Sequence, residues 1–205
     1  MIDRAVTLKA LALAAAGFYA TFPAAAAAQE AGTAPAAPNA AAPEPLAAEA
    51  GPILDLLAQE TDPVEAARLA REVEERWSHS GSAAMDLLLR RGEAAMEAED
   101  LDRAIVHLTA LTDHAPGFAA GWNARAEAFF RQEQYGAALT DIEQALILEP
   151  RHFGALTGLG IILEQFGDDA GALRAFRAVQ KIYPAEENVG RAVERLEQQT
   201  GGRTL

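Results

Sequence analysis

One spacing recurs through the second half of this chain, where residues of matching size return every 34 positions. A period between about 20 and 50 residues is typical of repeat proteins, in which each unit buries its apolar face only against neighbouring units. The period therefore predicts a stack of similar units. Four columns share this one register: large apolar Leu88, Trp122 and Leu156; small Gly92, Ala126 and Gly160; small Ala104, Ala138 and Ala172; and Pro116, Pro150 and Pro184.

Each unit has the pattern of two helices. In the second half of a unit, apolar residues recur three or four positions apart, as at Leu139, Ile142 and Leu146, which gives a buried stripe at the helical period. The proline that closes each unit lacks an amide hydrogen and disfavours helical geometry in the residue before it, so it ends the second helix. We therefore expect an all-α fold built from helix-turn-helix units.

The middle unit, residues 119–152, reads AAGWNARAEAFFRQEQYGAALTDIEQALILEPRH and resembles the tetratricopeptide repeat. Residues 153–186 match the same pattern, and residues 85–118 match it more loosely, with Arg91 and Leu111 where leucine and alanine are usual. The resemblance implies a right-handed superhelix whose concave groove is lined by the first helix of each pair. It says little about one function, because a fold of this kind serves many.

The first 28 residues resemble a secretory signal peptide, with Arg4 and Lys9, an apolar run over 10–22, and three alanines before Gln29. The alternative is an uncleaved membrane anchor, which needs about 20 strongly apolar residues. We favour cleavage because the run is mostly alanine and Pro23 interrupts it. Together with this segment, a composition rich in alanine and arginine and poor in lysine suggests a bacterial envelope protein. The expected location is the periplasm, without stable membrane insertion after cleavage.

The remaining segments frame the repeats. Residues 29–51 are rich in alanine and proline and predict a disordered linker. Residues 52–82 predict an N-terminal capping hairpin, in which Asp62 caps a helix that starts at Pro63 and runs to about Trp77. Residues 83–186 hold the three repeats. Residues 187–205 predict a capping helix, ending near Gln199, and a tail; Val189, Val193 and Leu196 form the apolar edge of that helix.

The charge and the motifs of the sequence exclude several classes of function. The net charge of −13 disfavours nucleic acid as a partner. The chain has no cysteine, and of its four histidines only His107 and His114 share a predicted helix, where they are seven residues and thus two turns apart, so we expect no metal site. Ser78, Ser80 and Ser82 flank His79 without the signs of a nucleophile turn, and the glycines around Leu159 lie inside a helical repeat, where they cannot form a nucleotide loop. We therefore expect no catalytic residue and no cofactor.

The first helix of each repeat carries side chains that the packing of the helices does not require, and these are the candidate binding residues. We expect a scaffold or adaptor without enzymatic activity that holds an extended or helical segment of another protein in the groove, with Glu127 and Glu164 pairing basic groups. Phe130 and Ile161 could instead pack within the domain. A self-assembling module and an enzyme accessory subunit remain as alternatives. The candidate groove residues are Arg90, Glu93, Asn123, Glu127, Phe130, Thr157, Ile161 and Glu164.

A carboxylate clamp, which one subfamily of these repeats uses to grip the C-terminus of a peptide with lysine, arginine and asparagine, is not expected here. The corresponding positions are Leu89, Glu93, Ala124, Gly154 and Gly158.

Overall fold

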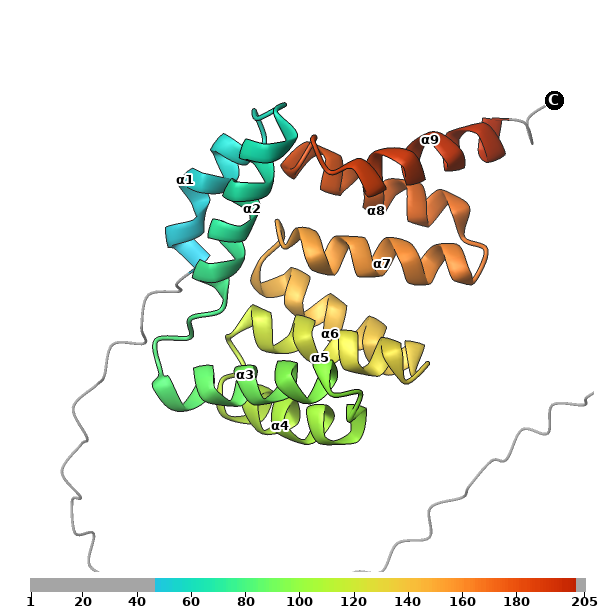
Figure 1. The fold of residues 1–205 in the computed structure, drawn as a ribbon. Coiled ribbons are helices and arrows are strands. Elements are labelled where there is room, and N and C mark those ends of the chain that lie inside the picture. The colour runs from blue at the N-terminus through green and yellow to red at the C-terminus, as the bar shows by residue number, and fades with distance from the viewer. Residues whose placement is uncertain (1–46, 202–205) are drawn as a thin grey trace, which may run out of the picture. The chain divides into compact units, whose positions relative to one another are not determined.

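A computed structural model describes residues 47–201, which lie within one compact unit of the chain, Ala40–Leu205. This part consists of helices joined by short turns and contains no strand, which confirms the all-α prediction (Figure 1). None of its helices is long and apolar enough to cross a bilayer. The predicted signal peptide and most of the predicted linker lie outside the described residues. The helices are α1 (Ala47–Leu57), α2 (Pro63–Trp77), α3 (Ala83–Glu97), α4 (Leu101–His114), α5 (Ala119–Arg131), α6 (Tyr135–Leu148), α7 (Phe153–Gln165), α8 (Asp169–Ile182) and α9 (Glu187–Gly201).

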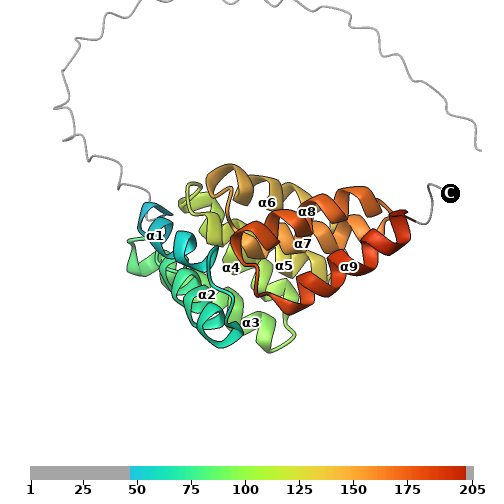
Figure 2. The same cartoon turned by 90° about the horizontal axis from the view of Figure 1, so that it is seen from above.

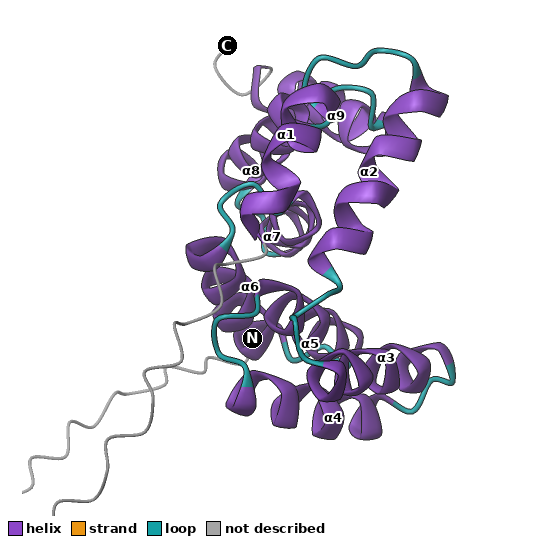
Figure 3. Ribbon diagram, turned by 90° about the vertical axis from the view of Figure 1, so that its left-hand side faces the viewer, coloured by secondary structure: helices purple, strands orange, loops and turns teal. Residues whose placement is uncertain are grey.

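The three repeats are the helix pairs α3–α4, α5–α6 and α7–α8. We call the first helix of each pair (α3, α5, α7) an A helix and the second (α4, α6, α8) a B helix. Each pair packs together, and α4 and α6 also contact the A helix of the next repeat. Figure 3 shows α5 and α7 following one another along one side of the stack, with α6 and α8 along the other. The 34-residue period thus appears as a solenoid of helix pairs.

The small residues of the A helices make room for large side chains of the B helices. A Cβ atom added at Gly92 would lie 2.5 Å from Leu108 Cγ, and one added at Gly160 would lie 2.6 Å from the ring of Phe176. Both contacts are too short for real atoms. The close approach predicted from the small columns is therefore confirmed, and it is a side chain rather than a bare backbone that fills the space.

The buried apolar side chains form three cores, each of which draws on more than one repeat or on a repeat and its flanking helices. One core joins α3 and α4 to the start of the second repeat, with Leu89, Leu108 and Leu111 fully or almost fully buried. A second joins α5 and α6 to α7 around Ile142 and Ile162. The third and largest combines α7 and α8 with α1, α2 and α9. Burial is thus shared between neighbours, as a solenoid requires.

The α1–α2 hairpin covers the third repeat, whereas a cap at the N-terminal end would be expected to cover the first. The Trp77 ring stacks on His152, with centroids 4.4 Å apart and planes 17° apart, and also contacts Phe153. Arg151 bonds Asp55 across the same contact at 2.7 Å. Asp62 caps α2 as predicted, accepting the amide hydrogens of the second and third helical residues. Figure 2 shows α1 and α2 side by side at the edge of the stack.

The hairpin begins earlier than the boundary predicted at residue 52. Helix α1 starts at Ala47 and contains Pro52, although proline lacks the amide hydrogen that an interior helical residue donates. Ala50 is completely buried in the same core as Leu54 and Leu57, so burial favours continuing the helix on the N-terminal side of the proline.

Helix α9 covers the outer face of α8, as predicted. Val189, Val193 and Leu196 are buried in the third core, and the helix continues two residues past the expected end at Gln199. Arg177 of α8 bonds Glu197 of α9 at 2.7 Å. The side of α8 that faces away from the other repeats is therefore covered.

Candidate protein-binding face

The A helices carry all of the candidate binding residues. Arg90 and Glu93 lie on α3, Asn123, Glu127 and Phe130 on α5, and Thr157, Ile161 and Glu164 on α7. Within each helix the spacings are three, four or seven residues, which places the members on one side of that helix. We call this set of residues the A-helix face.

The part of this face on α3 and α5 is acidic. Burial raises the pKa of Glu93, and the negative charges of Glu127 and Glu97 raise it further, while Arg90 opposes them. Neither Glu93 nor Glu127 forms an ion pair within residues 47–201. This region therefore holds negative charge that the fold leaves incompletely neutralised.

In the middle of the face, α5 and α7 approach each other. Asn123 is half-buried, and a Cβ atom added at Gly154 would lie 3.7 Å from its amide nitrogen. The Thr157 hydroxyl donates a hydrogen bond to the Phe153 carbonyl at 2.8 Å, so only its acceptor capacity is left for another molecule. The amide of Asn123 is the more versatile of the two groups, because it both donates and accepts.

The two apolar candidates have different environments. Phe130 is half-buried in the second core and meets the edge of Tyr135, with ring centroids 5.7 Å apart. Its role is thus largely internal, through neighbours in its own repeat and not through the α1–α2 hairpin. Ile161 remains 42% exposed and is the apolar side chain that the A-helix face offers to solvent.

Glu164 is engaged within the domain. Its carboxylate pairs with Arg195 of α9, one nitrogen of which lies 3.1 Å from the Glu164 Oε2 atom. This ion pair lowers the pKa of Glu164. The expectation that Glu164 pairs with a basic group of a partner therefore needs correction. Sequence spacing could not reveal Arg195, because α9 lies outside the repeats.

The sequence analysis also missed a buried ionic network between the first two repeats. Arg125 of α5 forms two hydrogen bonds with Asp141 of α6, at 2.7 and 2.8 Å, and donates to Thr112 of α4 at 2.8 Å and to Thr109 at 3.3 Å. Its guanidinium also lies over the ring of Trp122, 4.9 Å from the centroid. The network joins three helices and fills the crevice between α4 and α5.

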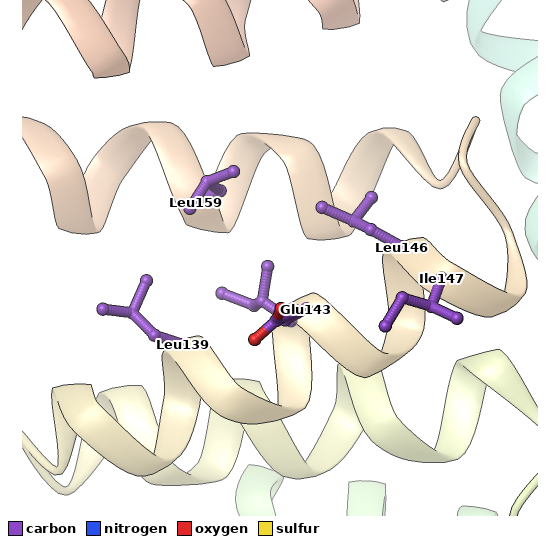
Figure 4. A pocket seen from close by; sticks show the side chains of 6 residues that line it. Leu139, Glu143, Leu146, Ile147 and Leu159 are labelled. Carbon is purple, nitrogen blue, oxygen red and sulfur yellow. The ribbon is translucent and has the colours of Figure 1, made fainter.

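One repeat later the equivalent crevice is open. The residues 34 positions after Arg125 and Asp141 are Leu159 and Ala175, which form no such network. A pocket of about 450 Å³ lies between α6 and α7. Figure 4 shows α6 side chains facing Leu159 of α7 across it. The lining residues are Leu139, Ile142, Glu143, Leu146, Ile147 and Leu159. The column Arg91, Arg125, Leu159 in the sequence was the available signal for this difference.

His152 is the one histidine that the core encloses in the described part of the chain. Its ring lies under Trp77, and its Nδ1 atom accepts the amide hydrogen of Ala155, which caps α7. Burial lowers the pKa of His152 to about 4, so the ring is neutral at physiological pH. Between residues 47 and 201 no three His, Asp or Glu side chains gather as a metal site would require.

Comparison with known proteins agrees with this architecture. A family model described as tetratricopeptide repeat matches residues 89–141 and 123–187. A TPR repeat-containing protein of Rhizobium etli is 36% identical over 146 residues, covering 71% of this chain and 72% of the relative. Superkiller complex protein 3 of Homo sapiens is 29% identical over 119 residues, which are 57% of this chain and 7% of that much longer protein.

Solved structures share the fold. The first TPR of Spaghetti (RPAP3), bound to an HSP90 peptide, has a TM-score of 0.56 at 20% identity and covers 58% of this chain and 95% of that one. The MamA protein has a TM-score of 0.54 at 18% identity, covering 76% and 83% respectively. Together with the repeat geometry and the Rhizobium relative, these matches establish that the chain belongs to the tetratricopeptide repeat family.

Proposed function

We propose that this chain is an exported protein-binding module, without enzymatic activity of its own, that holds a segment of a partner protein along the A-helix face. The observation that carries the proposal is the combination of exposed and unsatisfied groups on that face. Ile161 is 42% exposed, Asn123 offers an amide between α5 and α7, and Glu93 and Glu127 carry unpaired charge. None of these four side chains belongs to one of the three cores.

Related folds support a peptide as the occupant. The first TPR of Spaghetti is bound to an HSP90 peptide, and the TPR2B domain of yeast Sti1 is in a complex with pHsp70. The clamp positions of the present chain carry Leu89, Glu93, Ala124, Gly154 and Gly158, which offer no positive charge to a terminal carboxylate. The partner segment should instead carry basic residues for Glu93 and Glu127 and an apolar residue for Ile161.

Crosslinking in intact cells tests the proposal. A photoreactive residue at Asn123 or Ile161 should capture one partner chain, and the same residue at Val106, which is exposed on the B helix α4, should not. Replacing Glu93 and Glu127 by glutamine should weaken the capture at Asn123. Capture of the same partner from Val106, or capture that is indifferent to both glutamates, would contradict the proposal.

The export part of the proposal rests on the sequence of residues 1–28, which resembles a signal peptide. Fractionation of cells that express the full chain should place it in the periplasm, and sequencing of its N-terminus should begin at Gln29. A protein that retains Met1 and stays with the cytoplasmic fraction would refute export while leaving the binding proposal intact.

A further inference from the structure

The two interfaces between repeats differ at one place. Between the first and second repeats, Arg125 fills the crevice and its charge is neutralised by Asp141. Between the second and third, Leu159 and Ala175 occupy those two positions, and Glu143 and Leu146 replace the hydroxyls of Thr109 and Thr112. The result is the pocket between α6 and α7. The same arrangement of helices thus holds the side chain of Arg125 at one interface and an open pocket at the next.

We propose that this pocket binds a helical segment of a partner protein, which inserts apolar side chains together with one arginine or lysine that pairs with Glu143. We call the site the α6–α7 pocket. It goes beyond the binding proposed for the A-helix face, because it uses a different surface. Leu159 is two residues from both Thr157 and Ile161, a rotation of about 200° around α7, which places it on the opposite side of that helix.

The size and lining of the pocket suit a set of apolar side chains. A volume of about 450 Å³ falls within the range of about 300 to 1,000 Å³ that is usual for ligand pockets. Five of the six lining residues are leucine or isoleucine, and Ile147 is 65% exposed at the rim. An apolar side chain of a partner that entered the pocket would be removed from water and would contact these five side chains.

The positive charge of the occupant follows from Glu143. This residue is exposed, and it forms no ion pair or side-chain hydrogen bond within the part of the chain that the structure describes. At the equivalent place of the preceding interface, the guanidinium of Arg125 bonds Thr109. A basic side chain from outside would place its charge next to Glu143 in the same way. The net charge of −13 further favours a basic partner over an acidic one.

The helical form of the occupant follows from the layout of α6. Leu139, Ile142 and Leu146 lie three and four residues apart, so they form one stripe along the helix. The lining from Leu139 to Ile147 spans about 12 Å at 1.5 Å per residue. An amphipathic helix places residues i, i+3, i+4 and i+7 along a stripe of this length, and such a helix in a groove is a recurring mode of recognition.

Two synthetic helical peptides test the inference. Both carry leucine at positions i, i+3 and i+7, and they differ only at i+4, where one has arginine and the other glutamine. Methyl NMR of the full chain should show that the arginine peptide shifts the signals of Ile142, Leu146 and Leu159. We expect the glutamine peptide to bind at least about threefold more weakly, because it lacks the charge-assisted contact with Glu143.

Variants of the pocket provide the matched controls. Glu143→Gln should remove the difference between the two peptides. The double variant Leu159→Arg with Ala175→Asp introduces the ion pair of the first interface, and it should fill the pocket and reduce binding at least about tenfold. Ile147→Ser, at an exposed position, should weaken binding without affecting folding. It tests whether the peptide binds in the pocket even if the double variant fails to fold. Ile161→Ser should leave binding unchanged, which separates this site from the A-helix face.

Several results would overturn the inference. If neither peptide shifts the three methyl signals, the pocket does not accept a helix. If both peptides bind equally to the unaltered chain, Glu143 does not select a basic residue. If the folded double variant or Ile147→Ser binds as well as the unaltered chain, the peptide contacts another surface.

Discussion

Replacing Asp141 by alanine should destabilise the domain strongly, because it leaves Arg125 buried without its counter-ion. The side chain of Arg125 is 14% exposed and that of Asp141 is 4% exposed, so the guanidinium that remains would be poorly solvated. Breaking a buried ion pair by removing one partner typically costs about 3–5 kcal/mol. Arg125 would keep its hydrogen bonds to Thr112 and Thr109 and its contact with Trp122. We therefore expect a value near the lower limit, about 3 kcal/mol.

The double variant Arg125→Leu with Asp141→Ala should be far milder. It reproduces the pair Leu159 and Ala175, which the next repeat already accommodates. Replacing both members of a buried ion pair by apolar residues is often close to neutral. The Thr112 hydroxyl remains satisfied because it donates to the Thr109 carbonyl at 3.1 Å. We expect the double variant to lie within about 1 kcal/mol of the unaltered protein, and so to be more stable than Asp141→Ala alone by about 2 kcal/mol or more.

Urea unfolding followed by both tryptophan fluorescence and circular dichroism measures these free energies, and agreement of the two probes checks that the transition is cooperative. The reasoning fails if Asp141→Ala costs less than about 1 kcal/mol, since that value is typical of a solvent-exposed pair. It also fails if the double variant is as unstable as the single one, because the network would then be required for packing and not only for charge balance.

Three further predictions concern other contacts. The pKa of His152 is lowered to about 4 in the folded protein from about 6.5 in the unfolded chain, so the free energy of unfolding should fall by about 3 kcal/mol as the pH falls from 6.5 to 4. His152→Asn can still cap α7 and should abolish this loss. Urea titrations at several pH values measure both effects. Trp77→Ala should cost about 3–5 kcal/mol, because it removes a buried ring that stacks on His152, and it should raise hydrogen exchange selectively in α1 and α2. An equal rise in hydrogen exchange across the repeats would show that the hairpin does not unfold separately from them. Gly160→Ala should lower the thermal midpoint and cost about 1–3 kcal/mol, because the new methyl group would clash with Phe176. In the control Gly190→Ala the new methyl group meets no atom within 4 Å, so this variant should be neutral or stabilising. Equal effects of the two variants would refute the close approach of α7 and α8.

The sequence alone determined the repeat architecture. Contacts in a solenoid join residues close in sequence, so a period of 34 and the residue sizes within it specify which helices pair and which repeats stack. The cap at Asp62 and the apolar edge of α9 were equally local patterns, and both were predicted correctly. Most of the A-helix face could be assigned for the same reason, because position in the repeat fixes the side of the helix.

Only the tertiary structure decided where the flanking helices attach to the repeats and which side chains of the repeats they contact. The apolar stripe of α2 suits any apolar surface. One contact that holds the hairpin in place, between Asp55 and Arg151 in the turn before α7, joins residues 96 positions apart. The pairing of Glu164 with Arg195 likewise depends on how α9 lies over the last repeat. A periodic pattern specifies neighbours within the stack, but hydrophobic burial has no direction, so the docking site of the hairpin depends on shape and charge that appear only after the repeats have assembled.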